Sequence, residues 1–559
     1  MPTIKQLLTK KRNLIIILFI VFIFLRLFVD NHSVFLASDH LKFLEASKRF
    51  PTHTLYNDQL YLLHPPLYSY TIYFFTLIFQ DEFIAAVIVS LISAIITFFV
   101  LYKLFMMLTN NFYLTFFVLV FFTLSDSLII TSNVALRESF LIMLIFSTLY
   151  FFIKGVKFSD KKFLMFATIS GSVLALTSDH VVFIFPALVL SYLFFNPREI
   201  DLRKFKFPNL SYLILPLVII LLFYGSWSLL KFVQYSQYEF YPNGHSGMPI
   251  HIQDLGILQT ISPQFFEDYH GTVKADYKFV DFAKKLAFNL GYMLNLEPFD
   301  IPRGLNFTTM KYLLSLRHIA YMFIIYLPLA LLTIYGFIAM IRDFLKSKKI
   351  YNNTNLYLLL LFLVFIFPII QSTVSPRYIL TSYIFLFYFI SYGIVTLFEK
   401  KFKMKIITKI IALIVVLLII LVPFWYLQNN YVVLFSDKEI SAQNTGNFIN
   451  ANIPKDAAIM AQAGYTVKLN YLTDNRVLGL YAVPERLPDL IDFFNVSYVV
   501  VGRYYTYDAY HLAKDSVEYV RDNPDEFELI ATIEEDYSNF FVEDDLARTD
   551  EVYIYKVKN

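Results

Sequence analysis

Cysteine is absent from this chain of 559 residues. There is therefore no disulfide framework, no thiol nucleophile and no cysteine-based metal site, although this absence leaves the redox compartment undecided. Charge is also sparse, since Asp, Glu, Lys and Arg make up 16% of the residues and the formal net charge is +3. A net charge this small does not favour nucleic acid as a partner.

Apolar residues dominate instead, at 57% of the chain, and 61 residues are Phe. They form repeated runs of the roughly 20 residues that are needed to cross a bilayer about 30 Å thick. The first run, Leu14 to Val29, follows Lys10, Lys11 and Arg12 and shows no convincing cleavage site. We interpret this run as a retained signal anchor. The composition predicts an α-helical, multi-pass protein of the cell membrane that contacts the lipid bilayer.

Clusters of basic residues orient the predicted spans, because Lys and Arg accumulate in short cytoplasmic loops. Four clusters follow the first span, at 154–162, 198–206, 342–349 and 400–405. They are expected in the cytoplasm together with the N-terminus, and an even number of apolar segments separates each from the next.

The simple count of crossings fails once. The first span ends outside and the first basic cluster is expected inside, so the chain must cross the membrane an odd number of times between them. The helical segments expected there are 66–80, 84–107, 112–130 and 135–153. The first is the shortest and begins at Pro65 and Pro66, so we expect it to lie along or dip into the outer leaflet as a juxtamembrane helix. The pattern then predicts about eleven transmembrane helices.

The expected transmembrane domain covers residues 1–430, with a first extracytoplasmic loop at 30–83 and a large one at 233–317. Beyond its last span the chain becomes polar, and residues 436–559 are expected to form a small α/β domain outside the membrane. Its predicted strands are "AAIMAQA", "VSYVVVG", "FELIATI" and "VYIYKV". An acidic stretch, "EEDYSNFFVEDDLARTDE", is interpreted as a solvated surface. We expect this domain to help select the acceptor.

Ionisable residues gather directly after the first span, in "SDHLKFLEASKRFPTHTLYNDQLYLLHPPLYSY". Asp39 and His40 stand near its start, and His64 precedes two prolines that fix the backbone before a short helix. Carboxylates at the outer face are candidates for a general base or for orienting sugar hydroxyls, and basic groups beside them can hold a lipid phosphate.

This loop resembles the first extracytoplasmic loop of the polyprenyl-phosphate-sugar-dependent glycosyltransferases of the GT-C class, in the protein O-mannosyltransferase and aminoarabinose transferase group. In that family an acidic residue soon after the first helix is followed by a "PPLY"-like juxtamembrane helix. A second acidic residue starts the fourth span, where "SNVALRESFLIML" supplies Glu138. An Arg-Tyr pair starts a late span, where "SPRYILTSY" supplies Arg377 and Tyr378. The resemblance in order and topology covers residues 13–430.

The resemblance implies inverting transfer of a sugar from a polyprenyl-phosphate donor in the outer leaflet to a hydroxyl acceptor. It makes Asp39 the catalytic base and Glu138 a second catalytic carboxylate. The implied donor-phosphate ligands are Arg377, His64 and Arg26, and the implied substrate contacts are His40, Tyr378 and Asp179. The chain departs from the family at two points. Many members have a second acidic residue where this chain has His40. Some relatives have a basic residue beside the first proline, whereas this chain has only His64 there.

Each candidate also has a structural alternative. Asp39 could cap the helix that follows it, and Glu138 suits the first turn of a helix because of the helix dipole. Arg377 could anchor its span at the headgroup level, and Arg26 could extend its charged head to the interface. Asp179 could likewise have a purely structural role at the end of its helix.

Two other classes of protein stay open. A transporter or flippase would place ionisable residues at mid-depth in paired halves, and a non-catalytic scaffold would use the C-terminal domain without such residues. No cofactor is required by the pattern, and a divalent metal stays open because no ligand spacing is diagnostic. The sugar and the acceptor are not specified by the sequence.

Overall fold

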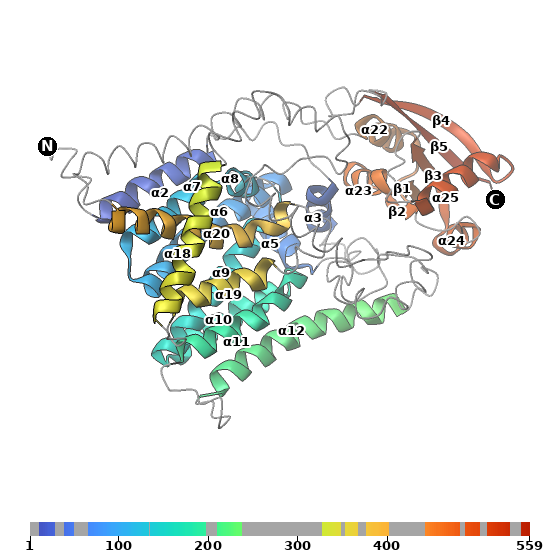
Figure 1. Cartoon of the computed structure of the whole chain (residues 1–559). Helices are drawn as coiled ribbons and strands as arrows, with labels where there is room; N and C mark the ends of the chain where they lie inside the picture. Colours follow the sequence, from blue (N-terminus) through green and yellow to red (C-terminus); the bar gives the residue numbers. More distant parts are fainter. Residues whose placement is uncertain are drawn as a thin grey trace.

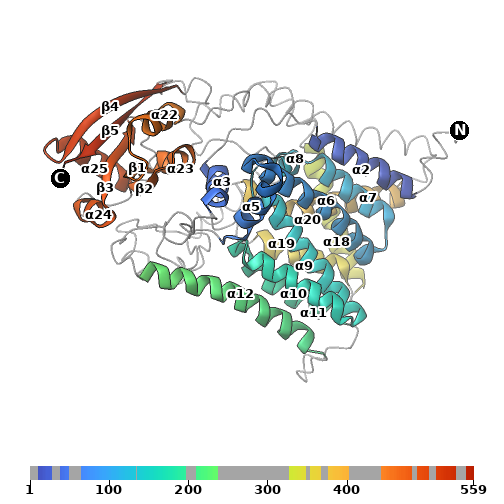
Figure 2. The ribbon, with the colours of Figure 1, turned by 180° about the vertical axis from the view of Figure 1, so that it is seen from behind.

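The computed structural model describes residues 11–27, 38–49, 65–133, 135–196, 209–236, 327–347, 353–366, 376–401, 442–480, 487–502, 511–536 and 549–558. These residues form a helical bundle and, after it in the sequence, a domain built on a β-sheet (Figure 1). The view from behind shows the same two parts, with the short helix α3 (Ser38–Arg49) between them (Figure 2). The predicted fold class, a helical membrane protein with a C-terminal α/β domain, is confirmed. The boundaries 1–430 and 436–559 stay predictions.

The first half of the bundle holds the predicted juxtamembrane helix and the spans around it. Besides α3 it contains α2 (Lys11–Leu27), α5 (Leu67–Phe79), α6 (Glu82–Thr109), α7 (Phe112–Leu124), α8 (Asp126–Ser132) and α9 (Glu138–Phe158). Side-chain caps fix where two of these helices begin. The Asp81 carboxylate accepts from the Ile84 amide at 2.8 Å, and the Asn111 side chain accepts from the Leu114 amide at 3.2 Å.

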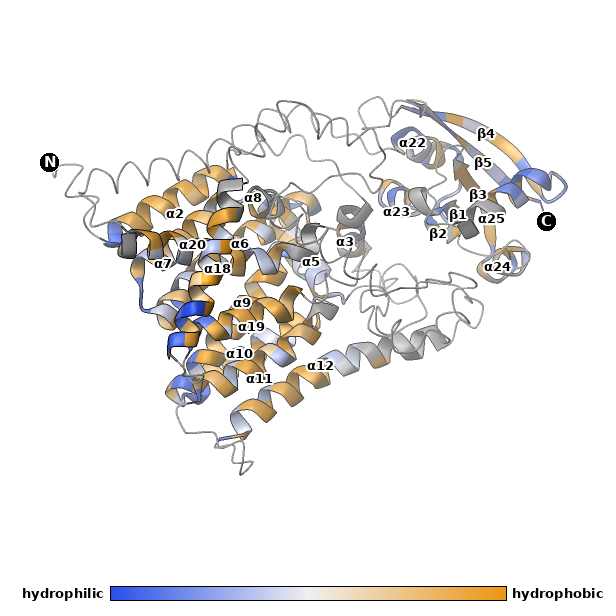
Figure 3. Cartoon of the chain, in the orientation of Figure 1, coloured by the Kyte–Doolittle hydropathy of each residue, from blue (hydrophilic) through white to orange (hydrophobic). Residues whose placement is uncertain are grey.

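The second half of the bundle packs against α6, α7 and α9. It contains α10 (Lys161–Ala175), the 3-10 helix η4 (Asp179–Phe183), α11 (Ile184–Phe195), α12 (Ser211–Ser236), α18 (Leu327–Ser347), α19 (Thr354–Ile366) and α20 (Pro376–Lys401). Apolar residues line these helices (Figure 3). On α12, Leu215, Leu222 and Leu229 recur every seven residues and are each more than 60% exposed. Such a stripe suits contact with lipid.

Three described helices are long and apolar enough to cross a membrane, namely Glu82–Thr109, Glu138–Phe158 and Leu380–Leu397. Five shorter apolar helices accompany them in the described part of the chain, α5 among them. The predicted total of about eleven spans stays a prediction, because the span expected near 406–427 and most of the loop 233–317 lie outside the described residues.

The segment expected to be one helix over 112–130 is divided at Ser125, so this part of the sequence prediction is wrong. Ser125 has an extended backbone, with φ −70° and ψ 117°. Its carbonyl accepts from the amides of Leu128 and Ile129 at 3.1 and 2.9 Å and thereby starts α8.

Two glycines let α18 and α20 cross with their backbones in contact. A Cβ added at Gly393 would lie 2.6 Å from the Leu332 carbonyl oxygen and 3.2 Å from the Gly336 Cα, and one added at Gly336 would collide with the Phe389 carbonyl. Neither position has room for a side chain. Close packing of this kind, through small residues, is a common way for helices to associate in membranes.

The C-terminal domain is a three-layer α/β fold. Its elements are α22 (Gln443–Asn452), β1 (Ala458–Gln462), α23 (Ala463–Leu472), β2 (Arg476–Leu480), α24 (Leu487–Phe494), β3 (Val496–Gly502), α25 (His511–Asp522), β4 (Phe527–Asp536) and β5 (Thr549–Val557). The strand order is β2-β1-β3-β5-β4. The first three strands are parallel, and β5 and β4 add antiparallel neighbours. All four predicted strands are confirmed, and β2 was not predicted.

Alternating side chains of the sheet hold helices on its two faces. Val500 packs with Leu469 of α23 on one face, where α22 also lies. The neighbouring Val499 packs with Ile491 of α24 and Val517 of α25 on the other face.

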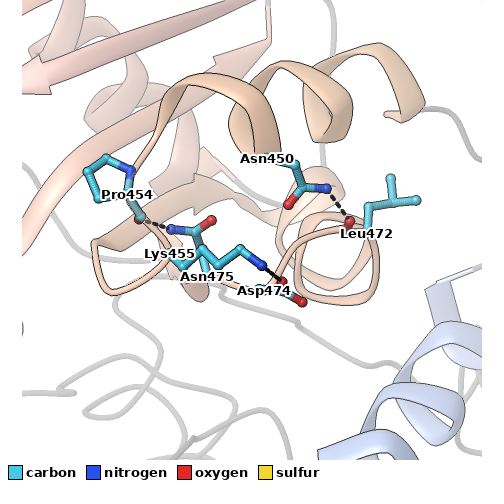
Figure 4. Close-up of polar contacts among 6 residues, drawn as sticks. All are labelled: Asn450, Pro454, Lys455, Leu472, Asp474 and Asn475. Atoms are coloured by element: carbon cyan, nitrogen blue, oxygen red, sulfur yellow. Dashed lines mark hydrogen bonds and ion pairs between the residues drawn. The ribbon is translucent and has the colours of Figure 1, made fainter.

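Polar contacts fix the C-terminal end of α23 and the turn that follows it. At its C-terminal end the Leu472 carbonyl accepts from the Asn450 side chain at 2.9 Å, and the following turn is held by the Lys455–Asp474 ion pair at 2.6 Å (Figure 4). The Asn475 side chain donates to the Pro454 carbonyl at 2.6 Å. The helix is therefore fixed to the turns that precede β1 and β2.

One residue of the acidic stretch is structural. Glu535 is buried, and its carboxylate accepts from both the amide and the hydroxyl of Thr445 at 2.6 Å, at the start of α22. A carboxylate at a helix N-terminus satisfies free amides and suits the helix dipole. The interpretation as a solvated surface is therefore wrong for Glu535, while residues 537–548 lie outside the described residues.

Candidate functional site

The first turn of α9 carries two adjacent buried charges, at the end of the bundle that is predicted to face outward. Glu138 is the first residue of the helix and is 6% exposed, and Arg137 directly before it is 9% exposed. The helix dipole stabilises the carboxylate at this position. Around this pair the structure assembles parts of α3, α5 and the turn before η4.

Tyr68, in the first turn of α5, is fully buried beside Glu138. Its hydroxyl lies 3.4 Å from the Ser90 Oγ of α6, and the Ser90 hydroxyl donates to the Leu136 carbonyl at 3.2 Å. The Tyr68 ring also packs on Phe140 in the first turn of α9, with ring centroids 5.9 Å apart. These contacts fix the start of the juxtamembrane helix against the loop that carries Glu138.

The helix α3 joins this cluster through Phe43. The Phe43 ring stands edge-on to Tyr68, with centroids 5.1 Å apart, and the Arg137 guanidinium lies over the Phe43 ring at 5.6 Å. Asp39 is one helical turn before Phe43 and so lies on the same face of α3. The structure thus brings the backbone positions of the two predicted catalytic carboxylates, Asp39 and Glu138, to one region.

The position of Asp39 differs from that of a helix cap. Because α3 begins at Ser38, Asp39 occupies its first turn rather than the residue before it. The side chains of Asp39 and His40 lie outside the described residues.

The turn between α10 and η4 closes another side of the cluster. The Leu67 amide donates to the Leu176 carbonyl at 3.1 Å, and the Arg137 guanidinium donates to the Thr177 carbonyl at 3.5 Å. Asp179 begins η4 two residues later, and its side chain lies outside the described residues. The predicted substrate contact is therefore placed near Arg137 by its backbone.

Arg377 lies in the first turn of α20, and this helix starts at the same end of the bundle as α9. Farther along α20, Tyr388 stacks on Phe105 near the end of α6. Lys157, near the end of α9, donates to the Met107 carbonyl, also near the end of α6. Both helices therefore begin at the opposite end, although the side chains of Arg377 and Tyr378 lie outside the described residues.

Arg26 is accounted for by the end of another helix. It is 1% exposed, and its guanidinium donates to the carbonyls of Thr123 and Phe122 at 3.3 and 3.4 Å, at the end of α7. It also lies 3.7 Å from the centroid of the Phe22 ring. The guanidinium is therefore buried against the end of α7, and donor-phosphate binding by Arg26 stays a prediction.

The geometry decides neither the role of His64 nor the binding of a metal ion. His64 lies outside the described residues. Among the residues that the structure describes, no three His, Asp or Glu side chains are grouped to hold a metal ion.

Sequence reasoning missed Arg137 and the role of Tyr68. A signal for both was present, since Arg137 is a charge inside an apolar run and directly precedes a predicted site residue. Tyr68 is the last residue of the "PPLY" motif. Charged residues in such runs are rare and commonly functional.

The described structure is that of a helical membrane protein with a polar cluster at one end of the bundle and an α/β domain beyond it. Residues 63–227 match the family model described as dolichyl-phosphate-mannose-protein mannosyltransferase. Over these residues the match confirms the resemblance seen in the sequence, and the matched segment includes α5, Arg137 and Glu138. The helices α3 and α20 lie outside it.

Two solved structures of ArnT from Cupriavidus metallidurans are similar to the chain. The apo state has a TM-score of 0.44 and 9% identity, over 96% of this chain and 97% of that chain. The state bound to undecaprenyl phosphate has a TM-score of 0.43 and 10% identity, over the same shares. No curated protein matches the chain.

Proposed function

We propose that this protein is a membrane glycosyltransferase that moves a sugar from a polyprenyl-phosphate donor to a hydroxyl acceptor at the outer face of the membrane. The observation that carries the proposal is the junction of α3, α5 and α9. It joins the helix with Asp39 to Glu138, within and beside the segment that matches a mannosyltransferase family model.

The proposed chemistry is a single displacement at the anomeric carbon. The acceptor oxygen forms a bond to that carbon while the bond to the phosphate oxygen breaks, and polyprenyl phosphate leaves with the electron pair. Asp39 takes the proton of the acceptor hydroxyl as general base. A displacement in one step inverts the anomeric configuration.

Glu138 is the second carboxylate of the proposed site. Its burial in the first turn of α9 gives it a fixed position from which it can orient a hydroxyl of the acceptor or the sugar. Interactions in such a water-poor region are stronger than in bulk solvent.

The donor phosphate is assigned to the basic candidates at the same end of the bundle. Arg377 in the first turn of α20 is proposed to contact it, because a guanidinium makes paired, charge-assisted bonds with phosphate oxygens. His64 is proposed to assist. A donor held in this way keeps its prenyl chain in the outer leaflet, and the acceptor enters from water.

A transporter or flippase is the other candidate function. It predicts buried ionisable residues at mid-depth. In the described part of the bundle, Arg26 lies near the end of α2, and Arg137 and Glu138 lie at the start of α9. Charges at helix ends favour the enzyme.

The test is to incubate the purified protein with a panel of polyprenyl-phosphate sugars and candidate acceptors and to follow the release of polyprenyl phosphate. We expect acceptor-dependent release with one class of donor, and much slower release by Glu138→Gln. The proposal fails if no donor is turned over while reconstituted protein moves a lipid-linked sugar across vesicles.

A further inference from the structure

The helix α3 is held from two sides. Its Phe43 side packs on Tyr68 of α5, and α23 of the C-terminal domain packs against it as well. Both views show α23 next to α3, between the sheet and the bundle (Figures 1 and 2). A helix of twelve residues has little stability of its own, so its position depends on these neighbours.

The buried residues of α3 surround the helix. Glu45 is two residues, and hence about 200° of helix rotation, from Phe43. It therefore lies on the side of α3 opposite to α5, yet it is only 1% exposed. An element other than α5 therefore covers this side, and α23 of the C-terminal domain and α6 of the bundle both contact α3.

The α23 helix uses one side for its own domain and another for the bundle. Tyr465 and Leu469 pack into the core of the sheet. Tyr471, on a different side, packs against the core of the bundle. Lys468, three residues before Tyr471, is 5% exposed. Among the described side chains of these two contacting helices, α3 thus buries Glu45 and α23 buries Lys468, and the two charges are opposite.

Tyr471 also lies within electrostatic range of the start of α6. Burial, together with the negative charges of Glu82 and Asp81, raises the pKa of Tyr471 to about 12. Asp81 is the residue that caps α6. The C-terminal domain therefore contacts the bundle at α3, with Tyr471 near the charges at the first turn of α6.

We propose that the C-terminal domain holds α3 in its catalytic position through α23, and that Tyr471 is a positioning residue for the carboxylate on α3. This rests on the proposed function, in which that carboxylate, Asp39, is the base. A catalytic group that moves by about 1 Å can lose about 100-fold in rate. The domain is then part of the machinery that sets turnover, whichever acceptor it helps to select.

The first test compares three variants of the full chain. Tyr471→Ala removes the contact with the bundle, and Tyr471→Phe keeps the ring. Tyr519→Ala is the matched control, because Tyr519 lies on α25 across the sheet and its described contacts, with Glu526, Asn523 and Phe527, all lie within its own domain. We expect Tyr471→Ala to lower kcat by about 10- to 100-fold with little change in donor KM. Tyr471→Phe and Tyr519→Ala should stay near wild type.

A second readout does not depend on activity. Hydrogen exchange of the α3 amides should be faster in Tyr471→Ala than in wild type, while exchange in α9 should not change. Faster α3 exchange in a protein that turns over no donor would support the docking and refute the proposed function. Unchanged α3 exchange together with unchanged kcat in Tyr471→Ala would overturn the inference.

A charge reversal tests which sides of the two helices meet. If Glu45 and Lys468 face each other, Glu45→Lys or Lys468→Glu alone should speed α3 exchange, because either change buries two like charges together. The double variant should restore slower exchange. Effects that simply add in the double variant would contradict an interface in which these two residues face each other.

Discussion

Replacing Arg137 with Met tests the junction that joins α3 to the start of α9. The variant keeps an apolar side chain of similar length but removes the guanidinium. It loses the cation–π contact with Phe43 at 5.6 Å and the bond to the Thr177 carbonyl at 3.5 Å. A desolvated cation–π contact contributes up to about 2 kcal/mol. The long bond from a charged donor adds about 1 kcal/mol, below the usual range for such bonds.

The total loss is therefore roughly 2 to 3 kcal/mol. If all of it falls on the arrangement that reacts, turnover falls by about 30- to 150-fold, since each 1.36 kcal/mol is a factor of ten in rate. Arg137→Lys keeps the charge but lacks the planar guanidinium, so its turnover should lie between those of Arg137→Met and wild type.

The assay is the release of polyprenyl phosphate, with thermal unfolding in detergent measured on the same samples. Arg342→Met is the matched control, because Arg342 is at the other end of the bundle and makes a partly exposed ion pair with Asp343 at 3.6 Å. It should change neither quantity much. Wild-type turnover and wild-type stability in Arg137→Met would refute the idea that Arg137 fixes the site.

Three further predictions follow from single contacts. Arg26→Met should lower the unfolding temperature without changing donor KM, because the carbonyls at the end of α7 lose their donor; a raised KM at unchanged stability would instead assign Arg26 to the donor phosphate. Gly393→Ala should destabilise the bundle by about 1 to 3 kcal/mol in thermal unfolding, by forcing α18 and α20 apart. Gly225→Ala should not destabilise the bundle, because nothing lies within 4 Å of the new Cβ. Equal effects of the two variants would contradict a close backbone contact between α18 and α20. Because the pKa of Tyr471 is raised to about 12, the undocked form loses its proton first and docking weakens as the pH rises above about 10. The unfolding temperature of wild type should then fall more steeply than that of Tyr471→Phe between about pH 10 and 12, and parallel curves would contradict this.

Most helices could be predicted from the sequence because long apolar runs are a strong signal. The break at Ser125 could not, since no Gly or Pro marks it and the restart of the helix depends on the Ser125 carbonyl. The strand β2 was missed for a related reason. Its five residues include Gly479 at the edge of the sheet, and it becomes a strand by pairing with β1.

The candidate site divides in the same way. Glu138 could be predicted because an acidic residue at the start of an apolar helix stands out locally. Arg137 and Tyr68 could not be given roles, because their partners Thr177 and Ser90 are distant in sequence. The position of Arg26 against α7 likewise depends on packing between helices, which charge patterns do not reveal.

The most direct test of the proposed chemistry is the turnover of Asp39→Asn in the polyprenyl-phosphate release assay. Asparagine keeps the size of the side chain but cannot accept the proton of the acceptor hydroxyl. We predict that turnover falls by about 10²- to 10⁴-fold, as is typical when acid–base catalysis is lost, while donor binding stays near wild type. Near-normal turnover in a correctly inserted Asp39→Asn protein would contradict the account and pass the role of base to Glu138.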